Sequence, residues 1–238
     1  MADSASGRAL HAKAEVARES GKFLDALKYT DEASLAYQKD GDYLGLAEVQ
    51  SSRQSTFKHL YRKTGDKYYL ILEKHSAQAS VEVAEKSKIK EALAIPYHNL
   101  GKYYQEAKEY EKAAEYFKKA VKHFTSYPPK RHNRPAVIAD ICGHLSAAEY
   151  LGGDKTALAR ALKALEDLKI SKEDSYNKNV WLSGAHLRIA EMLMIDSPKL
   201  AKLHLIEAEK IIKSDKRLVL RKNQLAELRK KLLRDFMS

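Results

Sequence analysis

The chain has little of what disulfide-bonded proteins and β-sheet proteins need. Its 238 residues include one cysteine, five prolines and ten glycines. The single cysteine, Cys142, excludes an internal disulfide. Scarce proline and glycine leave long stretches without a break in regular structure, and runs of β-branched residues are also few, which argues against a sheet. The sequence therefore predicts an all-α protein.

Long apolar stretches are missing as well. Residues 1–15 contain no apolar core of signal-peptide length. The most apolar segment, residues 180–195, carries His186, Arg188 and Glu191, so it falls short of the ~20 apolar residues that a membrane span needs. We expect a soluble, cytoplasmic protein without a membrane partner.

Sequence motifs for catalysis and metal binding are also lacking. The chain contains no GxxxxGK[ST], GxGxxG, HExxH, CxxC or GxSxG pattern, and no two of its nine histidines lie three or four residues apart. No helix can therefore present two histidines to one metal ion. We expect a protein that is not an enzyme, with no catalytic residues, no metal ligands and no cofactor.

What the chain has in excess is positive charge. Lysine and arginine number 43 against 32 acidic residues, which gives a net charge of +11. A basic surface favours acidic partners, namely acidic peptides, nucleic acid or anionic lipid.

The sequence also repeats itself. Turn-forming residues occur near positions 21, 65, 109, 153 and 197, in steps of 44 residues. After each turn, two positions seven residues apart on one face of a helix recur, and nine of these ten positions hold a small residue. Small side chains there let two helices approach closely. The pairs are Ala26 and Ala33, Leu70 and Ala77, Ala113 and Ala120, Ala157 and Ala164, and Ala201 and Ala208.

This period predicts five antiparallel helix pairs in a single domain, residues 1–238. We expect the repeats near 6–39, 42–86, 89–126, 134–169 and 175–213, and a capping helix at 216–236. The third repeat resembles a tetratricopeptide repeat through its large and small residues at that family's spacing. These are Tyr97, Leu100, Gly101, Tyr104, Tyr110, Ala113, Phe117 and Ala120.

The resemblance implies a right-handed α-α superhelix, a solenoid whose concave groove binds proteins or peptides. Its period of 44 residues exceeds the family's usual ~34. In this respect the chain is similar to the long-repeat variants in kinesin light chains, in G-protein regulatory scaffolds and in bacterial regulators that bind signalling peptides. Fold alone does not fix function.

In such proteins the first helix of each pair lines the concave groove. The matching polar residues are candidates for partner binding, because cationic donors suit a carboxylate. We also expect Tyr103 or Tyr104 to be exposed there. The alternative is that these are ordinary solvated side chains. The candidates are Arg18 in the first repeat, His59 and Arg62 in the second, and His98, Asn99 and Lys102 in the third.

A second candidate is the segment from Tyr116 to Ala139, which contains no acidic residue. Cations interleaved with aromatic residues suit contact with phosphates and bases. The alternative is structural, since Phe117 and Phe124 lie seven apart and should pack inward, and lysines near a helix C-terminus favour its dipole. The candidate contacts are Lys119, Lys122, Lys130, Arg131 and Arg134.

The C-terminal segment places Leu218, Leu225 and Leu232 seven residues apart, with Arg221 interrupting the stripe. We expect this helix to cap the array, because a terminal repeat must cover exposed core. Dimerisation or attachment to an acidic surface is the alternative, so monomer and homodimer both stay open.

The function predicted from these patterns is a non-enzymatic scaffold whose concave groove binds a protein or peptide, with a preference for acidic partners. Two alternatives stay open. One is a nucleic-acid-binding helical repeat protein that uses the basic segment and the last helix. The other is a peptide-sensing regulatory domain.

Overall fold

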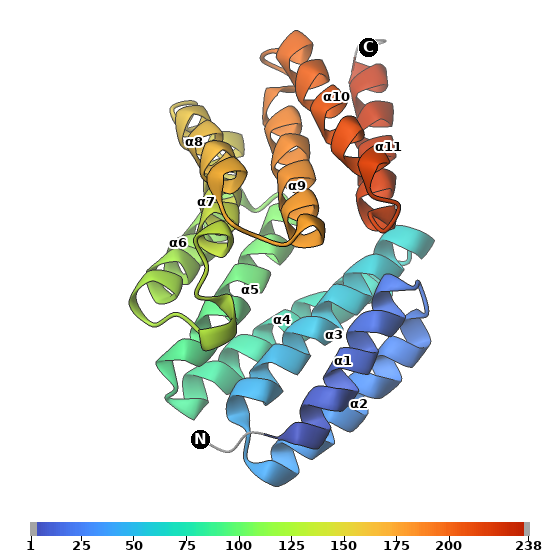
Figure 1. The fold of residues 1–238 in the computed structure, drawn as a ribbon, viewed down its shortest axis with the longest axis vertical. Coiled ribbons are helices and arrows are strands. Elements are labelled where there is room, and N and C mark those ends of the chain that lie inside the picture. The colour runs from blue at the N-terminus through green and yellow to red at the C-terminus, as the bar shows by residue number, and fades with distance from the viewer. Residues whose placement is uncertain (1–3, 236–238) are drawn as a thin grey trace. The chain divides into compact units, whose positions relative to one another are not determined.

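The computed structural model describes residues 4–235, almost all of them in helices joined by short turns (Figure 1). The chain divides into two compact units, Met1–Lys130 and Arg131–Ser238. The all-α prediction is confirmed. No helix within the described residues combines the length and the apolar character needed to cross a membrane.

The first unit contains three helix pairs. They are α1 (Ala5–Glu19) with α2 (Phe23–Asp40), α3 (Tyr43–Thr64) with α4 (Lys67–Ser87), and α5 (Ala94–Glu106) with α6 (Tyr110–Ser126). A short 3-10 helix, η1 (Lys90–Leu93), precedes α5. The first α-helix of the repeat predicted at 89–126 therefore begins only at Ala94, with Pro96 in its first turn, where the missing N–H costs nothing.

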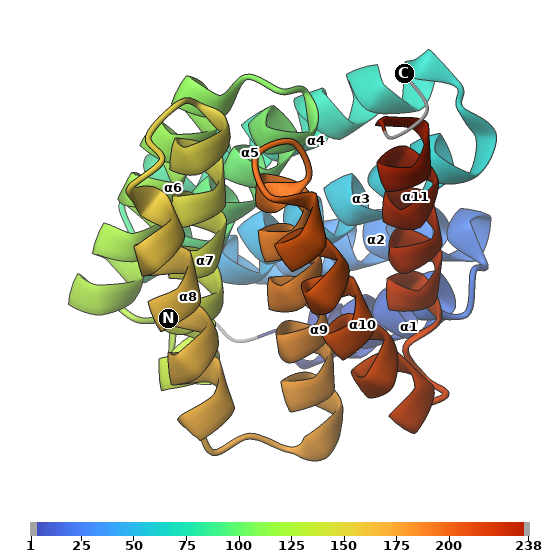
Figure 2. The same ribbon diagram turned by 90° about the horizontal axis from the view of Figure 1, so that it is seen from above.

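The second unit contains α7 (Pro135–Leu151) packed on α8 (Ala157–Ile170), and α9 (Ser175–Leu193) packed on α10 (Pro198–Ser214). A short 3-10 helix, η2 (Lys130–His132), lies at the boundary of the units. The last helix, α11 (Val219–Asp235), contacts both α9 and α10 (Figure 2). Predicted and observed helix ends differ by only a few residues.

The turns inside the pairs have the geometry that the repeat predicts. Gly21, Gly65, Lys108 and Gly153 have φ angles of 75°, 73°, 60° and 115°, in or near the left-handed region that ends helices. The fifth turn instead uses Pro198 as the first residue of α10, a position that suits its fixed φ. Lys108 adopts a conformation that glycine would adopt with less strain.

Alanine provides the close contacts within the pairs. The nine alanines of the predicted pattern are all buried, with exposed fractions of at most 4%. The tenth position, Leu70, is half-buried. The interpretation of this repeat as a packing device is therefore confirmed.

Glycine makes a still closer contact around Tyr37, which is 1% exposed. A Cβ atom built on Gly45 of α3 would lie 2.2 Å from Cε1 of the Tyr37 ring, and one on Gly7 of α1 would lie 2.6 Å from its Cδ1. In the third pair, a Cβ on Gly101 would lie 2.8 Å from Phe117. In these two cases a ring from a second helix, α2 or α6, rests directly on the backbone of a first helix.

The α11 helix packs through the predicted leucine stripe, since Leu218, Leu225 and Leu232 are buried. Arg221, which interrupts the stripe, lies over Gly184 of α9, where a Cβ would approach its Nη2 to 2.8 Å. Its Nε donates to the carbonyl of Val180 at 3.2 Å. The interruption is therefore accommodated by a glycine. The capping role of this helix stays a prediction.

Gly45→Ala should destabilise the first unit although alanine is the better helix former. The new methyl group must displace the buried Tyr37 ring, and overpacking of this kind costs about 1–3 kcal/mol, against a helix-propensity gain of about 1 kcal/mol. Urea unfolding followed by far-UV circular dichroism measures the difference. In a Tyr37→Leu background the same change should become neutral or stabilising. A stabilised Gly45→Ala single variant would contradict the packing described here.

Candidate functional site

The first helices of the first unit, α1, α3 and α5, share a polar face. The α3 helix contacts both of the others. Nη1 of Arg18 donates to Oγ of Ser52 at 2.8 Å, and Nε2 of Gln54 donates to the carbonyl of Asn99 at 3.0 Å. These hydrogen bonds join neighbouring repeats, so residues 34 and 45 positions apart meet on one surface.

An ion cluster lies at the α3–α5 contact. Nζ of Lys58 lies 2.7 Å from a carboxylate oxygen of Glu106, and Arg62 pairs with the other oxygen. Burial raises the pKa of Glu106, but the two cations outweigh that effect and lower it to about 2. Two cations share one carboxylate, so this cluster keeps a net positive charge.

His59 lies beside these cations but is not one of them. Its ring stacks on Phe23, with centroids 6.0 Å apart and an interplanar angle of 8°. Burial, followed by repulsion from Arg62, Lys58 and Arg18, lowers the pKa of His59 to about 3. Near neutral pH it offers a partner an aromatic ring and one N–H donor, but no positive charge.

Glu73 of α4 is the most unusual group near this face, because its side chain is completely buried. Neither of its carboxylate oxygens accepts a hydrogen bond of normal geometry within residues 4–235, and the same is true of Oε1 of the neighbouring Gln54. Burial raises the pKa of Glu73 to about 7, although Lys58 opposes that shift. When Glu73 is protonated, its carboxyl group carries an O–H donor, and the neighbouring Oε1 of Gln54 is an acceptor without a donor in the described residues.

The third-repeat candidates also lie on α5. The ring of His98 is 5.8 Å from that of Phe117, and His98, Asn99 and Lys102 are all half-buried. The expectation that Tyr103 or Tyr104 is exposed on this face is wrong. Tyr103 and Tyr104 are both buried, because Tyr104 stacks on Tyr116 with centroids 5.4 Å apart and Tyr103 meets the edge of its ring.

The basic segment belongs to both units and is described in two parts. In the first unit, Lys119 pairs with Glu115 at 2.6 Å, while Lys122 and Lys130 are exposed. Phe117 and Phe124 are buried, as predicted.

In the second unit, Arg134 pairs with Glu173 at 2.8 Å and lies over the Trp181 ring, 5.1 Å from its centroid. The side chain of Arg131 lies outside the described residues. Two of the five candidate cations, Lys119 and Arg134, are thus held by carboxylates of this chain.

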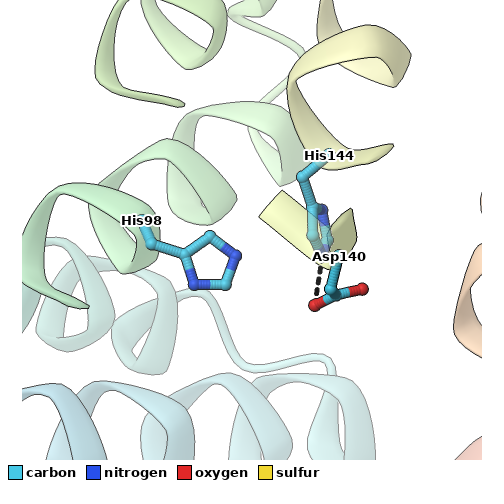
Figure 3. Close-up of side chains that lie close together, drawn as sticks. All are labelled: His98, Asp140 and His144. Carbon is cyan, nitrogen blue, oxygen red and sulfur yellow. Dashed lines mark ion pairs between the residues drawn. The ribbon is translucent and has the colours of Figure 1, made fainter. Parts of the chain in front are cut away.

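The second unit has a related ion cluster on its own first helices. Nη2 of Arg188 on α9 lies 2.5 Å from the Asp140 carboxylate of α7, and its Nη1 lies 2.8 Å from Nε2 of His144. Figure 3 shows the pairing of Asp140 with His144, one turn apart on α7. Here too an arginine joins two first helices, about one repeat apart in sequence.

Sequence reasoning missed Gln54, Lys58 and Glu73. The sequence contained a signal for the first two. Positions 54, 58 and 62 lie on one face of α3, so the choice of Arg62 as a candidate also indicated Lys58 and Gln54. Glu73 lies four residues before Ala77, on the buried stripe of α4. A carboxylate at a core position could have been noticed as unusual.

With this geometry established, the comparisons with known proteins identify the architecture. Residues 94–127 match the family model described as tetratricopeptide repeat. This is the third repeat, where the sequence carries the resemblance. The prediction of a tetratricopeptide-like helical repeat protein is confirmed. No curated protein sequence matches the chain.

Solved structures extend the likeness over most of the chain. BtubC (BKLC) from P. vanneervenii has a TM-score of 0.59 at 18% identity, over 84% of this chain and 77% of that one. Repeats of a putative kinesin light chain from Podosopora anserina score 0.53 at 13% identity, over 94% and 95%. The apo form of RapI scores 0.62 at 14% identity, over 96% and 65%. Such identities show a shared fold and no more.

Glu73 should make stability depend on pH. Its folded pKa of about 7 exceeds its ordinary value of 4.5, so at this site the folded state binds more protons between these values, and the contribution of Glu73 to stability falls as pH rises through that window. Glu73→Gln should remove this contribution and be more stable than the parent protein at pH 8 by about 1–3 kcal/mol.

Urea unfolding at pH 5 and pH 8, followed by circular dichroism, measures this difference. Glu82→Gln, an exposed change on the same helix, is the matched control and should behave like the parent protein. Equal stability of Glu73→Gln and the parent at both pH values would contradict the buried, neutral Glu73.

Proposed function

We propose that the protein is a non-enzymatic scaffold that binds an acidic peptide segment on the α1–α3–α5 face of its first unit. Helical-repeat arrays of the tetratricopeptide type generally serve protein–protein interaction. The observation that carries the proposal is the sharing of Glu106 by Lys58 and Arg62. This pairing fixes both cations in place and, while Glu73 is protonated, leaves the cluster with one more positive than negative charge.

The polar groups on this face are arranged to recognise a carboxylate. Arg18 is anchored on Ser52, and its side chain is 13% exposed. Its Nε also donates to the Glu19 carboxylate at 3.4 Å, and an arginine fixed by two hydrogen bonds keeps further N–H donors for a ligand. Because its guanidinium is already held in place, less side-chain entropy is lost when a peptide carboxylate binds.

Reversal of charge on this face should weaken peptide binding. The probes are fluorescein-labelled extended peptides of twelve residues, rich in Glu and Asp, and their Lys-rich twins. The acidic peptides should bind the parent protein and the basic ones should not. Arg18→Glu with Lys102→Glu should weaken binding at least about tenfold, since charge-assisted hydrogen bonds contribute about 1.5–3 kcal/mol each.

Lys28→Glu with Lys74→Glu is the matched control, because it changes the same total charge at exposed positions on α2 and α4. Fluorescence anisotropy gives the affinities, and circular dichroism verifies the fold. If both double variants bind equally well, the α1–α3–α5 face is not the binding site.

A nucleic-acid partner is the competing function, and a salt series separates it from the proposal. Neutralised phosphates release counterions, so affinity for a single-stranded oligonucleotide should fall steeply between about 50 and 200 mM salt. We expect weak binding, because Lys119 and Arg134 are already paired. Tight binding with a steep slope that Lys122→Glu and Lys130→Glu abolish would favour nucleic acid instead.

A further inference from the structure

The last helix of the second unit occupies the position of a first helix. It contacts α9 and α10 in the way that α3 contacts α1 and α2, and that α9 contacts α7 and α8. Val219, where α11 begins, follows the first residue of α9 by 44 positions. Every earlier first helix is covered by the second helix of its own pair, but within residues 4–235 no helix covers α11 in this way.

A groove lies between α10 and α11 and has a volume of about 690 Å³. The two helices run side by side in both views (Figures 1 and 2). Buried apolar side chains of Ile212, Leu218 and Leu225 line it, and Val219 is 53% exposed at its edge. On α11 the lining runs from residue 219 to 229, about three helical turns or ~16 Å.

The rim of this groove carries more positive than negative charge. Four cations line it, Lys213, Lys216, Lys222 and Arg229, against two carboxylates. Glu209 pairs with Arg229 at 2.7 Å and with Lys213 at 3.1 Å. The second carboxylate, Asp215, pairs with Arg217 at 2.7 Å.

The other two rim cations, Lys216 and Lys222, are exposed and have no ion-pair partner in the described part of the chain. An acidic ligand would therefore supply the charge that the rim lacks.

We propose that this terminal groove binds an acidic amphipathic helix of a partner protein. Apolar side chains at helical spacing would fill the apolar lining, as in helix-in-groove recognition, and carboxylates on the flanks would meet Lys216 and Lys222. A second copy of this chain fits less well, because a net charge of +11 opposes its approach to a basic rim.

The test uses three labelled 18-residue peptides. The first has Leu and Ala on one helical face and Glu elsewhere, the second replaces Glu with Lys, and the third permutes the first so that no face is apolar. The host for this test carries Arg18→Glu with Lys102→Glu, which removes the acidic-peptide site proposed for the first unit, and only the first peptide should bind that full-length chain. Lys216→Glu with Lys222→Glu should weaken its binding about tenfold, as expected for two surface charge pairs. Val219→Asp should weaken it by a similar factor.

Lys202→Glu and Leu203→Asp are the matched controls, since both residues are exposed on α10 outside the groove. They should leave the affinity of that host for the first peptide unchanged. Because the host already lacks the acidic-peptide site of the first unit, failure of the terminal groove is distinguished from failure of the α1–α3–α5 face.

Three results would overturn the proposal. They are a permuted peptide that binds as tightly as the amphipathic one, groove variants that retain full affinity, and a homodimer in sedimentation equilibrium that Val219→Asp dissociates. The last would mean that a second copy of this chain occupies the groove.

Discussion

Close approach of paired helices is the constraint on which the rest of this structure depends. Alanines seven residues apart, and glycines beneath Tyr37 and Phe117, bring helix backbones nearer than larger side chains would allow. Dispersion and hydrophobic burial are strongest where packing is dense. Because four of the five repeats present two alanines at the same spacing, and the second has Ala77 with Leu70, the pairs pack in a similar way. The polar residues at the equivalent positions of successive first helices are thereby brought to the same side of a unit.

This stacking explains why ion pairs in both units join residues about one repeat apart. Arg62 reaches Glu106 in the first unit, and Arg188 reaches Asp140 in the second. Charges at such half-buried positions lose hydration and must be matched by good partners. Glu73 has no such match, and burial favours its neutral form. The first unit therefore contains a fixed cationic cluster next to a carboxyl group that titrates near neutral pH.

The fold was predictable from particular residues, whereas the surface was predictable only in part. Turns at Gly21, Gly65 and Gly153 and the alanine pairs follow from backbone and packing rules that act locally, so the sequence carries them directly. Arg18, His59 and Arg62 were placed on the correct helices, but their partners were not, because Ser52, Phe23 and Glu106 come from other helices. Tyr103 and Tyr104 were expected to be exposed, but contacts with one another and with Tyr116 bury them. Pairing between repeats depends on the rotation of each helix, which a single period does not fix.

The most direct test of the central claim is to map an acidic peptide onto the protein by NMR. Amide shifts of the isotope-labelled chain would be followed during titration with a Glu-rich peptide of twelve residues. The account predicts that the largest changes fall on α1, α3 and α5, around Ser52, Arg62 and Asn99, with little change on α2 and α4. Shift changes confined to α2 and α4, or no shift change at saturating peptide, would contradict the assignment of the α1–α3–α5 face as the binding surface.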